Sequence, residues 1–203
     1  DELGDILDSI ANDSPYEAKG KAKIDLGVDV LPVFPKDNTD RNRTSPFAFT
    51  GNKFEFRMPG SAMNLSDANT VLNTAVAKVL KDFAAEMEGA EDFTAAAAVW
   101  IKKTIKEHER ILFNGNGYSA DWEAEAEKRG LLNMKTTVDA LPSMLSEKNI
   151  ALMSEMNVLS PVEMQSRYEV ELEHYSKVIN IEALTTLGMA RRQLIPAALE
   201  FLS

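Results

Sequence analysis

Residues 66–87 read SDANTVLNTAVAKVLKDFAAEM, and their apolar side chains recur in alternating steps of three and one. This spacing places all of them on one side of an α-helix: Ala68, Val71, Leu72, Ala75, Val76, Val79, Leu80, Phe83, Ala84 and Met87. Ser66 or Asp67 is the expected N-cap, and Gly89 lies just past the expected end. The stretch therefore predicts a long helix that buries one apolar face against other helices.

Helical patterns continue to the C-terminus. We expect a helix over 93–112, a short charged helix over 119–128 capped by Ser119, and a helix over 137–157 that is broken at Pro142. Ser160 and Pro161, with Glu163 at the third helical position, are typical of a capped helix start. That helix is expected to run towards Thr186, and a last segment over 187–202 has Pro196 near its end.

The N-terminal third is less helical. Leu3, Ile6, Leu7 and Ile10 predict an opening helix, and 24–33 alternates weakly. Residues 46–50 and 53–58 predict two short strands around a Gly51-Asn52 turn. The expected fold class is α+β and predominantly α-helical, with a short β-hairpin near the N-terminus followed by a helical bundle. The expected division is a strand-containing part over 1–65 and a helical region over 66–203.

The overall composition excludes several functions. The chain has 203 residues and a net charge of −10, which argues against a nucleic-acid-binding surface. It has no cysteine, so it has neither disulfides nor a thiolate zinc site. No apolar run is long enough to span a bilayer, so we expect a soluble, cytoplasmic protein. Because the chain starts with Asp1 inside a helical pattern, we interpret it as a fragment of a longer protein.

Positive charge gathers in one short region. Residues 36–58 carry five basic and three acidic residues, whereas the whole chain has 22 Lys and Arg against 32 Asp and Glu. In the predicted strand, Lys53, Glu55 and Arg57 share one face. They form either a solvated outer face or a site in which Glu55 holds a divalent metal and the cations hold anionic substrates. Alternation alone favours the solvated face.

Other candidates are weaker. The glycine-containing loop over 114–119 feeds a helix start and resembles a phosphate cradle, but ordinary helix-to-helix turns have the same composition. His108 and His174 have no second histidine at ligand spacing and are expected on the surface. Glu123, Glu125, Glu127 and Lys128 are expected to form a solvated helix face.

A family resemblance resolves the choice for the charged strand. The stretch over 40–58, DRNRTSPFAFTGNKFEFRM, resembles the C-terminal part of the glutamine synthetase catalytic domain, and specifically the type III branch of that family. So do FNGNGYS over 113–119, KTTVDALP over 135–142 and INIEAL over 179–184. The resemblance implies that 1–65 is part of the catalytic domain and that 66–203 is a helical C-terminal extension.

The resemblance also implies roles for single residues. Arg43 and Arg57 would bind glutamate, Lys53 the phosphates of ATP, and Glu55 a divalent ion, Mg²⁺ or Mn²⁺. Ala48 stands where many members carry another arginine, and Lys53 replaces the commoner arginine.

The implied activity is ATP-dependent ligation of ammonia to glutamate through a γ-glutamyl phosphate. The implied partners are the upstream part of the same enzyme and neighbouring subunits of a homo-oligomeric ring. Because one metal carboxylate cannot hold a catalytic ion pair, we expect the isolated chain to be inactive. The alternative is a non-catalytic helical module that mediates assembly of the same enzyme.

Overall fold

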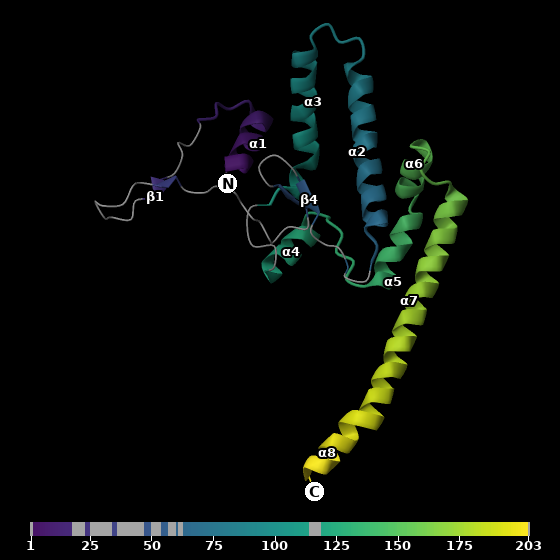
Figure 1. Cartoon of the computed structure of the whole chain (residues 1–203). Coiled ribbons are helices and arrows are strands. Elements are labelled where there is room, and N and C mark those ends of the chain that lie inside the picture. The colour runs from purple at the N-terminus through teal and green to yellow at the C-terminus, as the bar shows by residue number, and fades with distance from the viewer. Residues whose placement is uncertain are drawn as a thin grey trace. The chain divides into compact units, whose positions relative to one another are not determined.

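A computed structural model describes residues 2–17, 23–24, 34–35, 47–49, 54–56, 60, 63–113 and 119–202. The described residues form two compact units (Figure 1). Unit 1 contains residues 1–72 and 79–133, and unit 2 contains residues 73–78 and 134–203.

Unit 1 holds the first helices of the chain. Its helices are α1 (Glu2–Asn12), most of α2 (Leu65–Met87), α3 (Phe93–His108) with a 3₁₀ turn at Glu109–Ile111, and α4 (Ala120–Lys128). Helix α1 packs on α3. Between α2 and α3, Phe83 makes edge-to-face contacts with Trp100 and Phe93, at ring-centroid distances of 4.9 and 6.2 Å. Phe83 of the apolar face predicted for residues 66–87 therefore meets aromatic side chains of the following helix. Val71, Val76, Val79 and Leu80 of the same face are 49–60% exposed, so the face is not buried along its whole length.

Unit 2 is built around the first half of one long helix. Its elements are α5 (Thr137–Ala140), a 3₁₀ turn at Leu141–Leu145, α6 (Glu147–Glu155), α7 (Pro161–Met189), a π turn at Ala190–Leu194 and α8 (Ile195–Leu202). The 3₁₀ turn and α6 pack on α7. Met153 and Met164 are 5% and 3% exposed, and Thr74 of α2 is buried with them in this unit at 5%. These three are the buried residues among those that the structure describes.

Helix ends follow the predicted local signals in most places. The Ser160 hydroxyl accepts a hydrogen bond from the Glu163 amide, and the Glu163 carboxylate accepts one from the Ser160 amide, so the predicted capping box is present. Ser119 caps α4, and Gly89 and Gly130 adopt positive φ just past α2 and α4. The cap of α2 differs from the expectation, because Asn64 accepts from the Ser66 amide at 2.9 Å and the helix starts at Leu65.

The predicted α+β class is wrong for the described residues, which are predominantly α-helical. Their extended pieces are only two or three residues long: β1 (Lys23–Ile24), β2 (Phe34–Pro35), β3 (Phe47–Phe49) and β4 (Phe54–Phe56). β1 pairs with β2 and β3 with β4, each antiparallel. Two such local pairs do not form a sheet layer on which helices could pack. The predicted helical bundle agrees with the structure. The prediction that a β-hairpin helps to define the fold is wrong for the described residues.

Candidate functional site

The residues predicted to bind substrates lie mostly outside the described part of the chain. Arg43, Lys53 and Arg57 are not among the described residues. Glu55 lies in β4, and its Cα pairs with that of Ala48 in β3. The backbone register therefore places the predicted metal ligand, Glu55, opposite Ala48.

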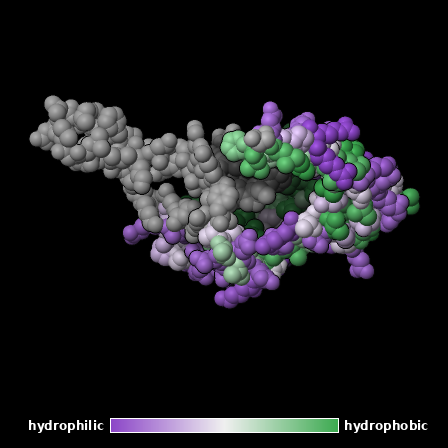
Figure 2. Space-filling model, turned by 90° about the horizontal axis from the view of Figure 1, so that it is seen from below, coloured by the Kyte–Doolittle hydropathy of each residue, from purple (hydrophilic) through white to green (hydrophobic). Residues whose placement is uncertain are grey.

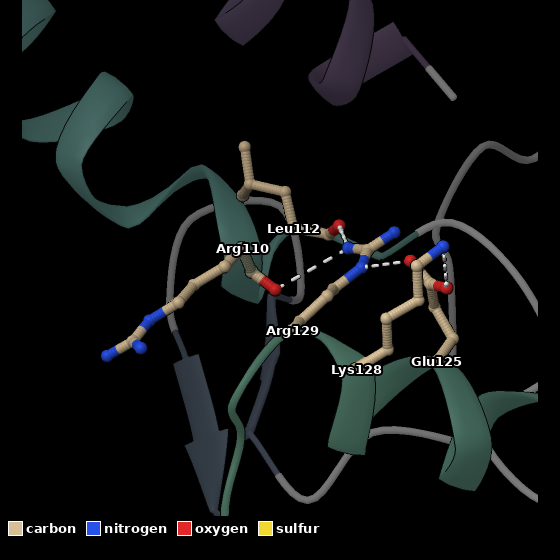
Figure 3. A network of polar contacts seen from close by, with 5 residues as sticks. All are labelled: Arg110, Leu112, Glu125, Lys128 and Arg129. Carbon is tan, nitrogen blue, oxygen red and sulfur yellow. Dashed lines mark hydrogen bonds and ion pairs between the residues drawn. The ribbon is translucent and has the colours of Figure 1, made fainter.

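The loop over 114–119 was the second candidate, and the structure describes both of its ends. Residues 114–118 themselves lie outside the described part. Arg129, just after α4, reaches back to the chain that leaves α3 (Figure 3). Its guanidinium donates to the carbonyl oxygen of Leu112 at 2.8 Å and to that of Arg110 at 3.4 Å. The chain segment that enters the loop is thus tied to the helix that follows the loop.

A carboxylate and two aromatic rings complete this Arg129 network. Arg129 donates to the Glu125 carboxylate at 2.6 Å, and its guanidinium carbon lies 5.7 Å from the centre of the Trp122 ring. Trp122 in turn stacks on Phe113, with ring centroids 3.8 Å apart and planes inclined by 22°. Figure 3 shows the Arg110 side chain directed away from the network, so Arg110 contributes its carbonyl oxygen. The arrangement fixes the backbone on both sides of the loop.

The electrostatics of the network are those of a structural contact. The hydrogen bond from Arg129 is the main cause that holds the pKa of Glu125 below its ordinary value, with a smaller contribution from the charge of Lys128. The ion pair with Glu125 thus helps to hold the guanidinium of Arg129 against the two carbonyl oxygens.

Sequence reasoning missed Arg129 because its main partners are backbone oxygens. The expected solvated face includes Glu125 and Lys128, and the ion pair from Glu125 to Arg129 has the common i, i+4 helix spacing. That spacing was the available signal. Every residue has a backbone carbonyl oxygen, so nothing in the sequence indicates that those of Arg110 and Leu112 accept from Arg129. The contact across the loop could therefore not be predicted.

No three His, Cys, Asp or Glu side chains of the described residues come together in a way that could hold a metal ion. Glu55 has the hard oxygen donor that Mg²⁺ or Mn²⁺ prefers, but a single carboxylate does not complete a metal site. Both histidines are exposed, as predicted.

A second ion pair joins α1 to α3. Lys102 donates to the Asp13 carboxylate, and this hydrogen bond is the main cause that lowers the pKa of Asp13. Asp13 adopts positive φ directly after α1, so the contact holds the end of that helix. Among the helices that the structure describes, none is long and apolar enough to cross a membrane.

Comparisons with known proteins agree with the resemblance predicted from residues 40–58. A family model described as "Glutamine synthetase C-terminal domain" matches residues 96–203. A protein named Type-3 glutamine synthetase from Dictyostelium discoideum is 46% identical over 97% of this chain, which corresponds to 27% of that protein. Proteins named glutamine synthetase from Butyrivibrio fibrisolvens and Bacteroides fragilis are 39% and 35% identical, over 96% and 98% of this chain and 28% of each relative. The chain thus spans little more than a quarter of the curated relatives it matches.

Proposed function

Because the chain belongs to the glutamine synthetase family, we propose that it forms the C-terminal part of a glutamate–ammonia ligase of the type III branch. The observation that carries the proposal is the 46% identity to a Type-3 glutamine synthetase over nearly the whole chain. The proposed reaction transfers a phosphoryl group from ATP to the side-chain carboxylate of glutamate. Ammonia then displaces phosphate from the γ-glutamyl phosphate and gives glutamine, in the cytoplasm.

We propose that this chain supplies part of the glutamate site. Arg43 and Arg57 bind the carboxylates of glutamate, because a guanidinium donates two parallel hydrogen bonds to a carboxylate. Lys53 neutralises the phosphates of ATP as a point charge. These cations offset the repulsion between two anions that must approach each other, and this stabilises the charge that spreads in the transition state.

Glu55 is the proposed metal ligand of this chain. A bound Mg²⁺ or Mn²⁺ supplies positive charge beside the phosphoryl group. Glu55 offers one carboxylate for it, and the remaining ligands come from the upstream part of the enzyme. We therefore propose that the 203-residue chain alone has no ligase activity, and that residues 1–65 belong with the catalytic part and residues 66–203 form a helical region.

The glutamate site is tested with Arg57→Lys in the full-length enzyme. A lysine keeps the charge but loses the two-point contact, so the KM for glutamate should rise about ten-fold or more. Arg41→Lys is the matched control, since Arg41 lies in the same basic stretch and has no proposed contact. Initial rates of glutamine formation at varied glutamate give the result. An unchanged KM for glutamate in Arg57→Lys contradicts the assignment.

A second test uses the purified 203-residue chain. We expect no γ-glutamyl transferase activity above background at saturating substrates and Mn²⁺. Transferase activity above background contradicts the proposal that the metal site of this chain is incomplete.

A second candidate function is a helical module for assembly of the same enzyme. It is favoured by one observation, the large apolar side chains that α7 and α8 leave exposed, among them Leu184, Leu199 and Phe201 at 61%, 63% and 90%. The two functions are compatible, because they use different parts of the chain.

A further inference from the structure

Helix α1 and helix α3, which pack on each other within unit 1, carry opposite charge (Figure 1). Residues 2–13 hold four acidic and no basic residues, whereas residues 93–108 hold three lysines and one glutamate. Lys102 and Lys106 are four residues apart, so they lie on one side of α3. The pKa of Asp13 is lowered mainly by the hydrogen bond and the charge of Lys102, and the charge of Lys106 adds a smaller contribution. The acidic end of α1 therefore meets a basic face of α3.

The residue that ends α1 is not the one its backbone favours. Asp13 has a φ of 52°, and glycine adopts such an angle more readily than a residue with a side chain. The corresponding positions after α2 and α4 are glycines, Gly89 and Gly130. The C-terminal end of a helix also favours a cation, but the last turn of α1 has no basic residue. We attribute the aspartate to its contact with Lys102, which brings a positive charge to this helix end from α3.

Apolar packing holds α1 only in part. None of its described side chains is buried: Ile6 and Leu7 are half-buried, and Leu3 and Ile10 are each 38% exposed. Hydrophobic residues also lie open beside hydrophilic ones on the face of the molecule that Figure 2 shows. A helix of 11 residues is marginal in water by itself. Helix α1 therefore depends on its contact with α3 to remain helical.

We propose that α1 is a strap that detaches from α3 while the rest of unit 1 stays folded, with the contact between Asp13 and Lys102 as its latch. Segments with few buried apolar groups open locally in this way. The side chains of Asp13 and Lys102 are 75% and 31% exposed, so salt screens their attraction and favours detachment. The strap joins residues 1–65 to residues 66–203, the two parts proposed above, and its test does not depend on their activity.

Hydrogen exchange of the 203-residue chain, read by mass spectrometry, tests the strap. In the wild-type chain we expect the amides of residues 6–12 to exchange faster than those inside α3, and faster again at high salt. Asp13→Asn removes the charge and keeps the backbone, since Asn157 adopts a φ of 54° after α6. This variant should speed exchange in α1 about two- to five-fold at low salt and reduce the response to salt.

Two comparisons assign the effect to the latch. Lys102→Met should act like Asp13→Asn, and the double variant should be no worse than either single variant, because both remove the same contact. Lys103→Met is the matched control, since the Lys103 side chain is 58% exposed and its Nζ lies 3.9 Å from Glu86 Oε1 of α2. It removes the same charge from the neighbouring position and should leave exchange in α1 unchanged. Exchange in α7, measured in the same samples, shows that each variant remains folded.

Four outcomes overturn the proposal. Amides of α1 that exchange as slowly as those of α3 at every salt concentration show that α1 does not open separately. Amides of α1 without any protection in the wild-type chain show that it is not docked. Unchanged exchange in Asp13→Asn, or equal effects of Lys102→Met and Lys103→Met, shows that the ion pair is not the latch. None of these results affects the glutamate test, which measures KM.

Discussion

The guanidinium of Arg129 donates a hydrogen bond to the carbonyl oxygen of Leu112 at 2.8 Å, across a separation of 17 residues. Leu112 precedes the loop over 114–118 and Arg129 follows the helix after it, so one side chain holds both flanks of that loop. Its further contacts to Glu125 and to the face of Trp122 keep the guanidinium in place.

Replacing Arg129 is expected to destabilise unit 1. Arg129→Met removes the donors to two carbonyl oxygens and should lower the free energy of unfolding by about 1–2 kcal/mol. Urea unfolding followed by tryptophan fluorescence measures this, because Trp100 and Trp122 both lie in unit 1. Lys128→Met is the control. The Lys128 side chain is 81% exposed and its Nζ lies 3.8 Å from Glu125 Oε2, and such an exposed ion pair contributes little to stability. Equal effects of the two variants would contradict the assigned role of Arg129.

The methionine core of unit 2 should respond strongly to truncation. Met164 is 3% exposed, so Met164→Ala leaves a cavity in unit 2 and should cost about 2–4 kcal/mol of unfolding free energy. Met189→Ala, at a position that is 46% exposed, should change stability by less than about 0.5 kcal/mol. Chemical denaturation followed by circular dichroism at 222 nm compares them, and a neutral Met164→Ala would show that this residue is not part of the core.

The capping box predicts a defined pH dependence. The amide and hydroxyl of Ser160 lower the pKa of Glu163 from its ordinary value of 4.5. Because the folded-state pKa is the lower one, this stabilisation is present above pH 4.5 and is lost as pH falls through the folded-state pKa. Melting temperatures of wild type and Glu163→Ala should therefore differ more at pH 7 than at pH 3.

The matched control for the capping box is Glu169→Ala, at an exposed position of the same helix outside the box. Its difference from wild type should change less with pH than that of Glu163→Ala. A Glu163→Ala difference that stays constant from pH 7 to pH 3 would remove the box as the source of the effect.

The sequence predicts the helices well because their signals are local. The capping box at Ser160 and Glu163, the glycines after α2 and α4, and the break at Pro142 each act within one turn of helix. The contact from Arg129 to Leu112 depends on where two distant segments meet, and periodicity does not encode that. The hairpin predicted over 46–58 does not define the fold, because alternation describes one face of a strand and does not predict the sheet layer that helices would pack on. Within the described residues, Phe47–Phe49 and Phe54–Phe56 form a local pair.

The predicted site divides in the same way. Glu55 could be placed opposite Ala48 by backbone register, whereas the roles of Arg43, Lys53 and Arg57 come from resemblance and stay predictions. Pro196 predicts an interruption near the end of the last helix. The interruption is a π turn, and this form depends on the hydrogen bond from the Ile195 amide to the carbonyl of Ala190, which the sequence does not predict.

The π turn at Ala190–Leu194 is also where we expect the long helix to unfold first under an applied force. A regular α-helix is a stiff rod, and a load applied at one end is carried along its hydrogen-bond ladder. At Ala190–Leu194 the ladder changes to bonds of longer reach, and Pro196 leaves one carbonyl without its usual amide. We therefore expect mechanical strain on α8 to open this turn before the capped first half of α7.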